Sequence, residues 1–449
     1  MTPRTFKTYI EQAPINNSQL LIATIIVLAL VVDGLDLLML AFISPLMIEE
    51  WEVDKASFGV ALSAALITMA IGAFVGGWAG DRFGRQRILM ISIVSFSSAT
   101  MLTSMVTDLF WLTNLRLASG LGFGAATPNG LALVTEWLPD RARARVASAV
   151  SVASPLGGII AGSVALLLVP TVGWQGSFVV SGIIALIIGL IVLLAIPESP
   201  TFLAANGRSD QAHKMVSRVF GYKDAEMLTF TDQIVGGSQQ NSIFSRSNLR
   251  FNISLSTAFF CCSFVTFAVS SWITVVLKIL GLTFSDAAQG LLWFNVLAVM
   301  SAFIMPPLLT WFGSRTTMLF AASMTLILCG FLIGITYTRD SLSYPQLSFF
   351  LWTIAGSLGL SQGLFNATFY VVIASGYSTS MRASGSGFAL MVNRAGGVLS
   401  IFASGVIMTA TQDSAAAFAL TLGGVIILAM VAVMTIDRHI PKRSKRSTR

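Results

Sequence analysis

Three ionisable residues lie inside long apolar runs of this sequence. Asp33 and Asp36 occur in the run that follows Gln19, and Arg394 lies twelve residues after Arg382 in another run. A charge near the bilayer centre costs at least about 2.5–3.5 kcal/mol, so such residues are candidates for a functional site. At 1.5 Å per residue, each lies roughly 18–20 Å along its helix, near the midplane. The i, i+3 spacing predicts that both aspartates share one helix face.

These residue types suggest a specific chemistry. A guanidinium group binds a carboxylate through two hydrogen bonds and keeps its charge, which makes Arg394 a candidate for substrate binding. An aspartate in a membrane cavity can take up a proton, which makes Asp33 and Asp36 candidates for proton coupling. Together they are the parts of a proton-coupled carrier of organic anions. The alternative is a structural salt bridge between an aspartate and Arg394 or Arg116.

Arg116 is a further charge within an apolar run, and it heads a stripe that continues with Gly120, Gly124 and Thr127. Glycines at this spacing let a second helix approach closely. Arg116 is therefore either part of a proton relay or a residue that pins helices together.

Aromatic and amide side chains in other apolar runs could line a substrate site. Trp272, flanked by serines and a threonine, and Tyr370 could stack on an aromatic substrate. Asn366 is a candidate hydrogen-bond donor. For each of these residues, packing against lipid or neighbouring helices is the alternative.

The composition identifies the class of protein that holds these residues. The chain has 449 residues, of which 55% are hydrophobic and only 10% are charged. An ordinary soluble domain has about 25% charged residues. The sequence therefore predicts a multi-pass membrane protein and argues against a secreted enzyme or a nucleic-acid binder. No nucleophile–base pair or metal cluster is visible, so we expect neither an enzyme, a metal site nor a cofactor other than the proton gradient.

The apolar runs predict an all-α fold of twelve transmembrane helices in two six-helix bundles. A bilayer crossing needs about 20 apolar residues. The predicted spans are roughly 20–47, 57–79, 88–107, 109–135, 145–169, 175–196, 250–277, 286–309, 316–337, 347–374, 383–410 and 415–436. The corresponding domains are an N-terminal bundle (1–196), a cytoplasmic linker (197–248), a C-terminal bundle (249–437) and a basic cytoplasmic tail (438–449).

The basic residues orient these spans. Nearly all of the 27 Lys and Arg residues fall on one side of the predicted membrane. Only Lys55, Lys278 and Arg339 fall on the other side, and Arg116 and Arg394 lie within spans. The positive-inside rule then places both termini in the cytoplasm, in the inner membrane of the cell. The same bias explains the net charge of +7 without a nucleic-acid partner.

The two predicted bundles carry matching sequence elements. Residues 154–158, with Gly157-Gly158, follow Arg143 at the same distance as residues 393–397, with Gly396-Gly397, follow Arg382. A second match relates residues 81–85 to residues 310–315. Secondary transporters are often built from such repeats.

Several of these segments resemble motifs of the major facilitator superfamily. They are Gly77 to Arg87, Arg116 with Gly120, Ser154 to Gly158, Glu136 with Arg143, and Pro197 to Pro200. Within that superfamily, the segment Asp33-Gly34-Leu35-Asp36, the segment Arg382 to Gly385 and the segment Asn393 to Gly396 are similar to signatures of the aromatic acid/proton symporters. Asn393 departs from the usual glycine, and Thr310-Trp311 departs from the common Asp-Arg.

The resemblance implies roles for particular residues. Substrate contact and proton coupling are implied at Asp33, Asp36 and Arg394. A conformational gate is implied at Asp81, Arg85, Glu136, Arg143 and Arg382. Asp81 also fits this role on physical grounds, because a charge at a helix end can pair across the bundle interface in one state and separate in another.

The sequence therefore predicts a monomeric proton symporter that imports a small carboxylate by alternating access, with an aromatic acid of the hydroxybenzoate type as the preferred substrate. Three alternatives remain open at this point: a carrier of a non-aromatic acid, a drug/proton antiporter, and a transporter-like sensor that signals through its linker.

Overall fold

A computed structural model describes residues 4–139, 141–142, 146, 149, 152–220, 228–229, 245–377 and 382–441. The described chain is helical apart from one short parallel strand pair, which joins β1 (Arg4–Thr5) to β2 (Leu228–Thr229). The helices are α1 (Phe6–Gln12), α2 (Asn17–Glu50), α3 (Lys55–Phe83), α4 (Arg85–Thr103), α5 (Leu109–Trp137), α7 (Ala153–Ala195), α8 (Pro200–Ala205), α9 (Ser209–Phe220), α10 (Arg246–Ile279), α11 (Phe284–Thr338), α12 (Tyr344–Gly376), α13 (Arg382–Ala410) and α14 (Ala415–Thr435).

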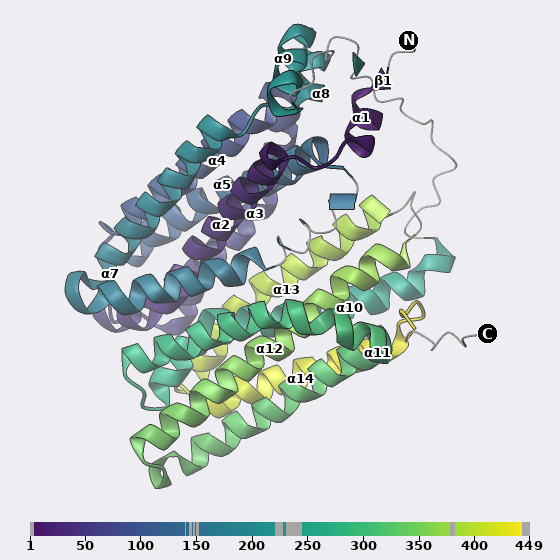
Figure 1. Ribbon diagram of the computed structural model, residues 1–449. Helices are drawn as coiled ribbons and strands as arrows, with labels where there is room; N and C mark the ends of the chain where they lie inside the picture. Colours follow the sequence, from purple (N-terminus) through teal and green to yellow (C-terminus); the bar gives the residue numbers. More distant parts are fainter. Residues whose placement is uncertain are drawn as a thin grey trace.

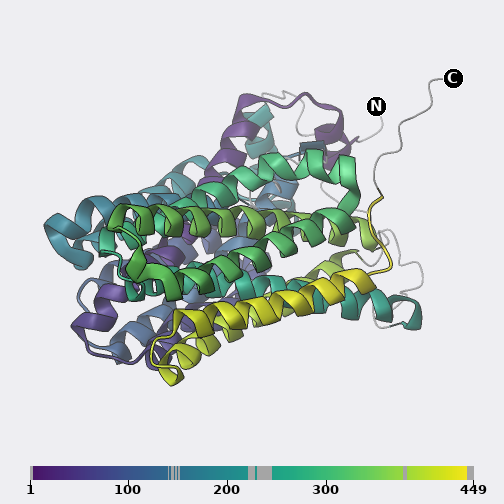
Figure 2. The ribbon, with the colours of Figure 1, turned by 90° about the horizontal axis from the view of Figure 1, so that it is seen from below.

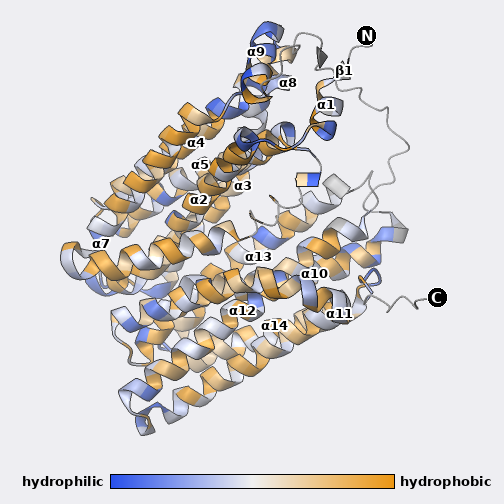
Figure 3. Cartoon of the chain, in the orientation of Figure 1, coloured by the Kyte–Doolittle hydropathy of each residue, from blue (hydrophilic) through white to orange (hydrophobic). Residues whose placement is uncertain are grey.

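Eight of the described helices are long and apolar enough to cross a membrane: α2, α3, α7, α10, α11, α12, α13 and α14. Large apolar side chains on their outer faces remain exposed, such as Phe74, Leu194 and Phe303. Such exposure suits a lipid environment, where a helix satisfies its own backbone hydrogen bonds. In Figure 3 the hydrophobic colour runs along the helices and hydrophilic residues concentrate toward their ends.

Two of these helices each contain a sharp kink at a glycine. α7 has 43 residues with Gly173 at φ 69°, and α11 has 55 residues with Gly313 at φ 78°. A positive φ is readily adopted only by glycine. A straight helix of 55 residues would be about 80 Å long, far more than a bilayer requires. Each of these two elements therefore consists of two helical segments joined at the glycine.

The helices form two groups with matching internal contacts. In the N-terminal group α2 packs on α7, and α3 packs on α5; in the C-terminal group α10 packs on α13, and α11 packs on α12. The matched glycines lie at these contacts, because a Cβ at Gly157 would overlap the backbone of α2 and one at Gly396 would overlap Phe260 of α10. The repeated sequence elements thus make equivalent helix contacts in the two groups.

The two groups meet through α3 against α13, α7 against α11 and α2 against α10. We call this boundary the seam. In Figure 1 the groups lie together at the lower left and diverge toward the side that carries both chain termini. Figure 2 also shows both termini at one end of the helices. We call this the terminal end, and the opposite end, where the two groups are joined by polar contacts, the sealed end.

The segments that flank the two groups are partly helical. Within the predicted linker, α8 and α9 pack together, and the amide of Asn16 donates a hydrogen bond to the carbonyl of Val219. After α14, the carbonyl of Ile440 accepts a hydrogen bond from the amide of Ser314. The domain boundaries at residues 196, 248 and 437 stay predictions.

Candidate functional site

Asp33 and Arg394 come from different groups and lie within electrostatic reach of each other. Asp33 on α2 and Arg394 on α13 are both partly exposed. The charge of Arg394 acts on Asp33 and also on the hydroxyl of Tyr370 on α12. Tyr370 is 44% exposed. Neither Asp33 nor Arg394 has a hydrogen-bond or ion-pair partner among the described residues.

Close glycine contacts fix how the helices that carry these two side chains are rotated about their axes. Gly34 lies against the backbone of Ser154, so this face of α2 points toward α7. Asp33 precedes Gly34 by one residue and is rotated from it by about 100°. On α13, Gly396 lies against the backbone of Phe260 on α10. These contacts set the rotation of each helix about its axis, and with it the direction of the charged side chain.

Asp36 has different surroundings and forms a buried ion pair. Its Oδ2 lies 2.8 Å from Nη1 of Arg116, and both side chains are 2% exposed. The hydroxyl of Thr100 donates to Asp36 Oδ1, and Arg116 Nη2 donates to Thr103 Oγ1 at 3.0 Å. The guanidinium also lies 5.9 Å from the ring centre of Phe178. The pair therefore links α2, α4, α5 and α7 within the N-terminal group.

This arrangement corrects the expectation that both aspartates share one face. Residues at i and i+3 differ by about 60° around a helix axis. That offset is enough for Asp33 to reach the seam while Asp36 points into the N-terminal group. Both Asp36 oxygens have protein partners here, so the direct substrate contact predicted for Asp36 is absent from this conformation. For Arg116, the helix-pinning alternative matches the observed contacts.

Trp272 also departs from expectation. Its indole is fully buried, and its Nε1 donates to the carbonyl of Ile401 at 2.9 Å. Gly59 of α3 and Gly405 of α13 contact the ring edge and leave room for it, since a Cβ at either position would press on it. Trp272 is therefore a packing residue at the seam and does not line an exposed surface. A large aromatic ring suits this position because glycines face it from two helices.

Asn366 lies in a polar network inside the C-terminal group. Its Nδ2 donates to Thr266 Oγ1 at 2.9 Å and to the carbonyl of Gln362 at 3.2 Å. Both amide protons are therefore used within the protein. The expectation that Asn366 serves as a hydrogen-bond donor to a ligand does not match this geometry, because the group left over is its Oδ1.

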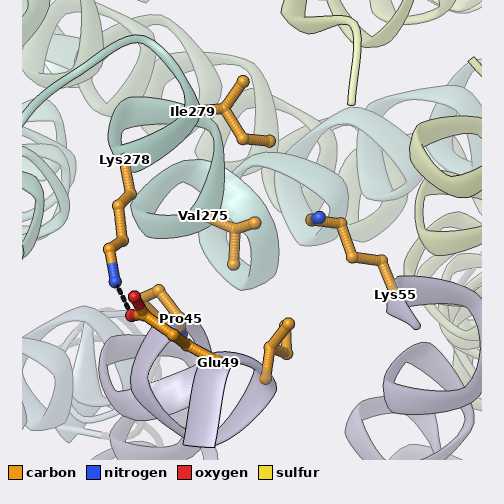
Figure 4. A pocket seen from close by; sticks show the side chains of 7 residues that line it. Pro45, Glu49, Lys55, Val275, Lys278 and Ile279 are labelled. Carbon is orange, nitrogen blue, oxygen red and sulfur yellow. Dashed lines mark hydrogen bonds and ion pairs between the residues drawn. The ribbon is translucent and has the colours of Figure 1, made fainter. Parts of the chain in front are cut away.

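Two ion pairs cross the seam at the sealed end. Lys55 Nζ lies 2.7 Å from Asp413 Oδ1, and Lys278 pairs with Glu49. Each group thus contributes one lysine and one carboxylate. In Figure 4, Lys55 and Lys278 flank a pocket of about 220 Å³ from opposite sides, with Val275 between them.

Hydrogen bonds reinforce this seal. The amide of Ala56 donates to Thr409 Oγ1 at 3.0 Å, and Thr274 donates to the carbonyl of Ala41 at 2.6 Å. Gly405 lies against the backbone of Lys55, so the two helices approach closely beside the ion pair.

The predicted gate residues that the structure describes gather at the terminal end. Arg85 Nη2 lies 3.1 Å from Asp81 Oδ1, and Arg85 also pairs with Glu136. The side chain of Asp81 is 71% exposed. All three residues belong to the N-terminal group, so these contacts do not cross the seam. Arg143 and the side chain of Arg382 lie outside the described residues.

Sequence reasoning missed several residues that hold these clusters. Ser199 donates to Glu136, and Glu198 Oε1 accepts from the amides of Gln86 and Ser199 at 3.0 and 2.9 Å. From the sequence, the segment Pro197 to Pro200 was interpreted only as a motif of the superfamily. Lys55 and Lys278 were interpreted only as basic residues on the extracellular side of the membrane. Nothing in the sequence pairs them with Asp413 and Glu49, because these partners are hundreds of residues apart.

Comparison with known proteins identifies the family of this fold. The sequence profile of the Major Facilitator Superfamily matches residues 26–401. The 4-hydroxybenzoate transporter PcaK of Acinetobacter baylyi is 28% identical over 95% of this chain and 92% of its own length. A gallate transporter of Pseudomonas putida is 32% identical over 45% of each chain. The inward open structure of the xylose transporter XylE from E. coli superposes with a TM-score of 0.71 at 16% identity, covering 96% of this chain and 98% of that one. This chain belongs to the Major Facilitator Superfamily of membrane transporters and is not an enzyme.

Proposed function

We propose that the protein imports a small aromatic carboxylate together with protons. The observation that carries the proposal is that Arg394 and Asp33, one from each group, lie within electrostatic reach of each other, both partly exposed and without protein partners among the described residues. The names of the relatives, which are transporters of 4-hydroxybenzoate and gallate, support an aromatic acid as the substrate class.

The charges explain how proton and substrate are coupled. Arg394 can balance one negative charge, which is either ionised Asp33 or the carboxylate of the substrate. Two carboxylates beside one guanidinium repel each other, so the substrate binds best when Asp33 is protonated. Release of the proton from Asp33 in turn favours release of the substrate. Proton and anion therefore travel together, and no cofactor other than the proton gradient takes part.

Twelve spans and cytoplasmic termini complete the proposal. Counting the kinked α7 and α11 as two segments each, and adding α4 and α5 to the other long helices, gives two bundles of six. The basic residues concentrate at the terminal end, which supports a cytoplasmic location for both termini in an inner membrane. All residues of the proposed substrate site belong to one chain, which supports a monomer as the transporting unit.

Alternating access follows from the two ends of the seam. The sealed end, with its ion pairs Lys55–Asp413 and Lys278–Glu49, would be the extracellular side in its closed state. The exposed Asp81 at the terminal end has no contact across the seam with a described residue, which supports an open cytoplasmic side. Rocking of the two groups about the midplane would open the first end and close the second.

Uptake into proteoliposomes tests the proposal. With the protein inserted so that an imposed proton gradient runs in the import direction, labelled 4-hydroxybenzoate should accumulate, and collapse of the gradient should abolish accumulation. Arg394→Lys keeps the charge but loses the planar fork, so KM should rise about tenfold or more. Arg339→Lys, at an exposed position, is the matched control and should behave as wild type.

Other outcomes identify the rival functions. Binding without accumulation would indicate a sensor, and export driven by the same gradient would indicate an antiporter. If only non-aromatic acids accumulate, the proposed aromatic substrate is wrong, and the proposed proton symport mechanism still holds.

A further inference from the structure

In the polar network around Asn366, each hydrogen bond has a defined donor and a defined acceptor. Gln362, Thr325 and Ser361 are fully buried. Ser361 donates to the carbonyl of Leu358 at 3.0 Å, so it accepts from Thr325 at 2.9 Å, and Thr325 Oγ1 in turn accepts from Gln362 Nε2 at 2.8 Å. Gln362 Oε1 is therefore the acceptor end of its amide, and it lies 3.0 Å from the hydroxyl of Thr266.

The position of the Thr266 hydroxyl proton determines which end of the Asn366 amide faces Thr266. The hydroxyl proton of Thr266 goes either to Gln362 Oε1 or to the carbonyl of Cys262, at 3.0 and 2.9 Å. In both cases the oxygen of Thr266 presents a lone pair to Asn366. The second partner of Asn366, the carbonyl of Gln362, can only accept. A flipped amide would set its oxygen against the carbonyl of Gln362 and draw the Thr266 proton away from Gln362 Oε1 and the Cys262 carbonyl, so the network favours Nδ2 turned inward.

The oxygen of Asn366 is consequently left without a partner. Asn366 Oδ1 accepts no hydrogen bond from the described residues, and it is not among the buried atoms that lack one. Asn366 lies one helical turn, about 6 Å, before Tyr370 on the same face of α12. Arg394 lies one turn before Gly397 on α13, and Gly397 lies against the ring of Phe267, the residue that follows Thr266 on α10. A fixed acceptor and a cation therefore lie in one region of the C-terminal group.

We propose that Asn366 Oδ1 accepts a hydrogen bond from a ring hydroxyl of the bound aromatic acid and thereby selects hydroxylated substrates. This inference rests on the proposed function, in which Arg394 binds the carboxylate. A molecule with a carboxylate at one end and a neutral hydroxyl at the other complements a guanidinium and a fixed acceptor. A second carboxylate or a methyl ether has no proton to donate to Asn366, and a site with an unpaired polar group discriminates against such ligands.

The unmodified protein provides the first test. Uptake of labelled 4-hydroxybenzoate into proteoliposomes is measured in competition with the three hydroxybenzoate isomers, their methyl ethers and benzoate. At least one hydroxybenzoate should compete about five- to tenfold better than its methyl ether and than benzoate, the effect of one hydrogen bond. Equal competition by each hydroxybenzoate and its ether would overturn the assignment of Asn366, whether or not any variant folds.

The variant Asn366→Leu locates the effect. It removes the acceptor at nearly constant size, so hydroxybenzoate should lose its competitive advantage over benzoate and over its methyl ether. Thr368→Val is the matched control on the same helix, since the one bond of the Thr368 hydroxyl within the described part of the chain is to the carbonyl of Leu364. It should keep the preference. A preference that survives Asn366→Leu would reject Asn366 as the selecting residue.

The two proposals fail in different ways. If wild type accumulates benzoate and hydroxybenzoate without preference, the role of Asn366 is rejected and aromatic acid transport remains. If wild type transports neither acid, both proposals are rejected together.

Discussion

Two aspartates three residues apart on α2 illustrate how a small rotation separates two environments. Asp36 is enclosed with Arg116, Thr100 and Thr103, whereas Asp33 is partly exposed at the seam. Removing one partner of a buried ion pair leaves an uncompensated charge, which is far more costly than losing an exposed one. The same substitution at the two positions should therefore have different consequences.

Asp36→Asn should destabilise the fold, and Asp33→Asn should impair coupling. Breaking the buried pair with Arg116 is expected to cost about 3–5 kcal/mol and to lower the Tm in detergent. Asp33→Asn should keep the wild-type Tm but lose accumulation driven by a proton gradient, while retaining exchange of substrate across the membrane. Thermal unfolding and proteoliposome uptake measure the two effects. An unchanged Tm for Asp36→Asn would exclude the structural role.

At the scale of elements, two ion pairs close the sealed end, and the lysine comes from the N-terminal group in one pair and from the C-terminal group in the other. Lys55 of α3 reaches Asp413 beyond α13, and Lys278 of α10 reaches Glu49 of α2. Exposed ion pairs contribute only about 0–1 kcal/mol each. Free energies of this size contribute little to the stability of the fold. They are large enough to shift the equilibrium between a closed and an open sealed end several-fold.

Reversing one ion pair should open this end, and exchanging both charges should close it again. Lys55→Glu places two carboxylates together, whereas Lys55→Glu with Asp413→Lys restores attraction. The reporter is Thr274→Cys, because Thr274 is buried at the seal and becomes reachable when α2 and α10 separate. Labelling by an impermeant thiol reagent should accelerate about two- to fivefold in the single reversal. Equal labelling rates in the single and double variants would show that the Lys55–Asp413 ion pair does not hold the sealed end closed.

A second element with a testable electrostatic contact is the segment after α14. His439 Nδ1 lies 3.1 Å from Ser314 Oγ, and its Nε2 lies 3.0 Å from the carbonyl of Val433. Burial lowers the pKa of His439 below its ordinary value, and nearby Arg315 lowers it further. The folded state therefore favours the neutral ring. Its stabilising contribution is present above about pH 6.5 and is lost as the pH falls toward the depressed folded-state pKa.

Acidification should thus loosen this segment. Hydrogen exchange at the amides of Ser314 and Ile440, corrected for the intrinsic rate, should increase between pH 7.5 and pH 5.5. His439→Gln cannot be protonated in this range and should show a pH-independent rate. A wild-type rate that does not change with pH would show that His439 does not control docking.

The whole molecule is polarised along the seam. Contacts of the two groups close one end, while at the other end the ion pairs of Asp81, Arg85 and Glu136 that the described residues show lie within the N-terminal group. Basic residues are concentrated at that second end. Both observations give the molecule one orientation in the membrane.

This orientation predicts that both termini face the cytoplasm. Epitope tags at the N-terminus and at the C-terminus should be reached by antibody only after the membrane is permeabilised. A tag inserted after Gln412, in the turn between α13 and α14, should be reached without permeabilisation. The opposite pattern would invert the proposed assignment of the extracellular and cytoplasmic ends.

Sequence reasoning predicted much of this molecule because some physical signals are local. Long apolar runs indicate membrane helices, and charges within them mark Asp33, Arg116 and Arg394 as unusual. The matching Gly-Gly pairs predicted two related bundles, and the structure adds that Gly157 and Gly396 make equivalent helix contacts in them. Trp272 was misjudged because its polar neighbours in sequence are not its neighbours in space, where glycines of other helices enclose it.

The amino-acid sequence by itself determined the class of protein, the helices and the charges buried among them, since these depend on composition and on residue spacing. Only the tertiary structure decided which aspartate faces the seam, which cation Asp36 binds and which end of the Asn366 amide is left unpaired. The physical reason is that each residue turns a helix by about 100°, so the close contacts between helices set the direction of every side chain. The direction of a hydrogen bond likewise depends on partners that only folding brings together.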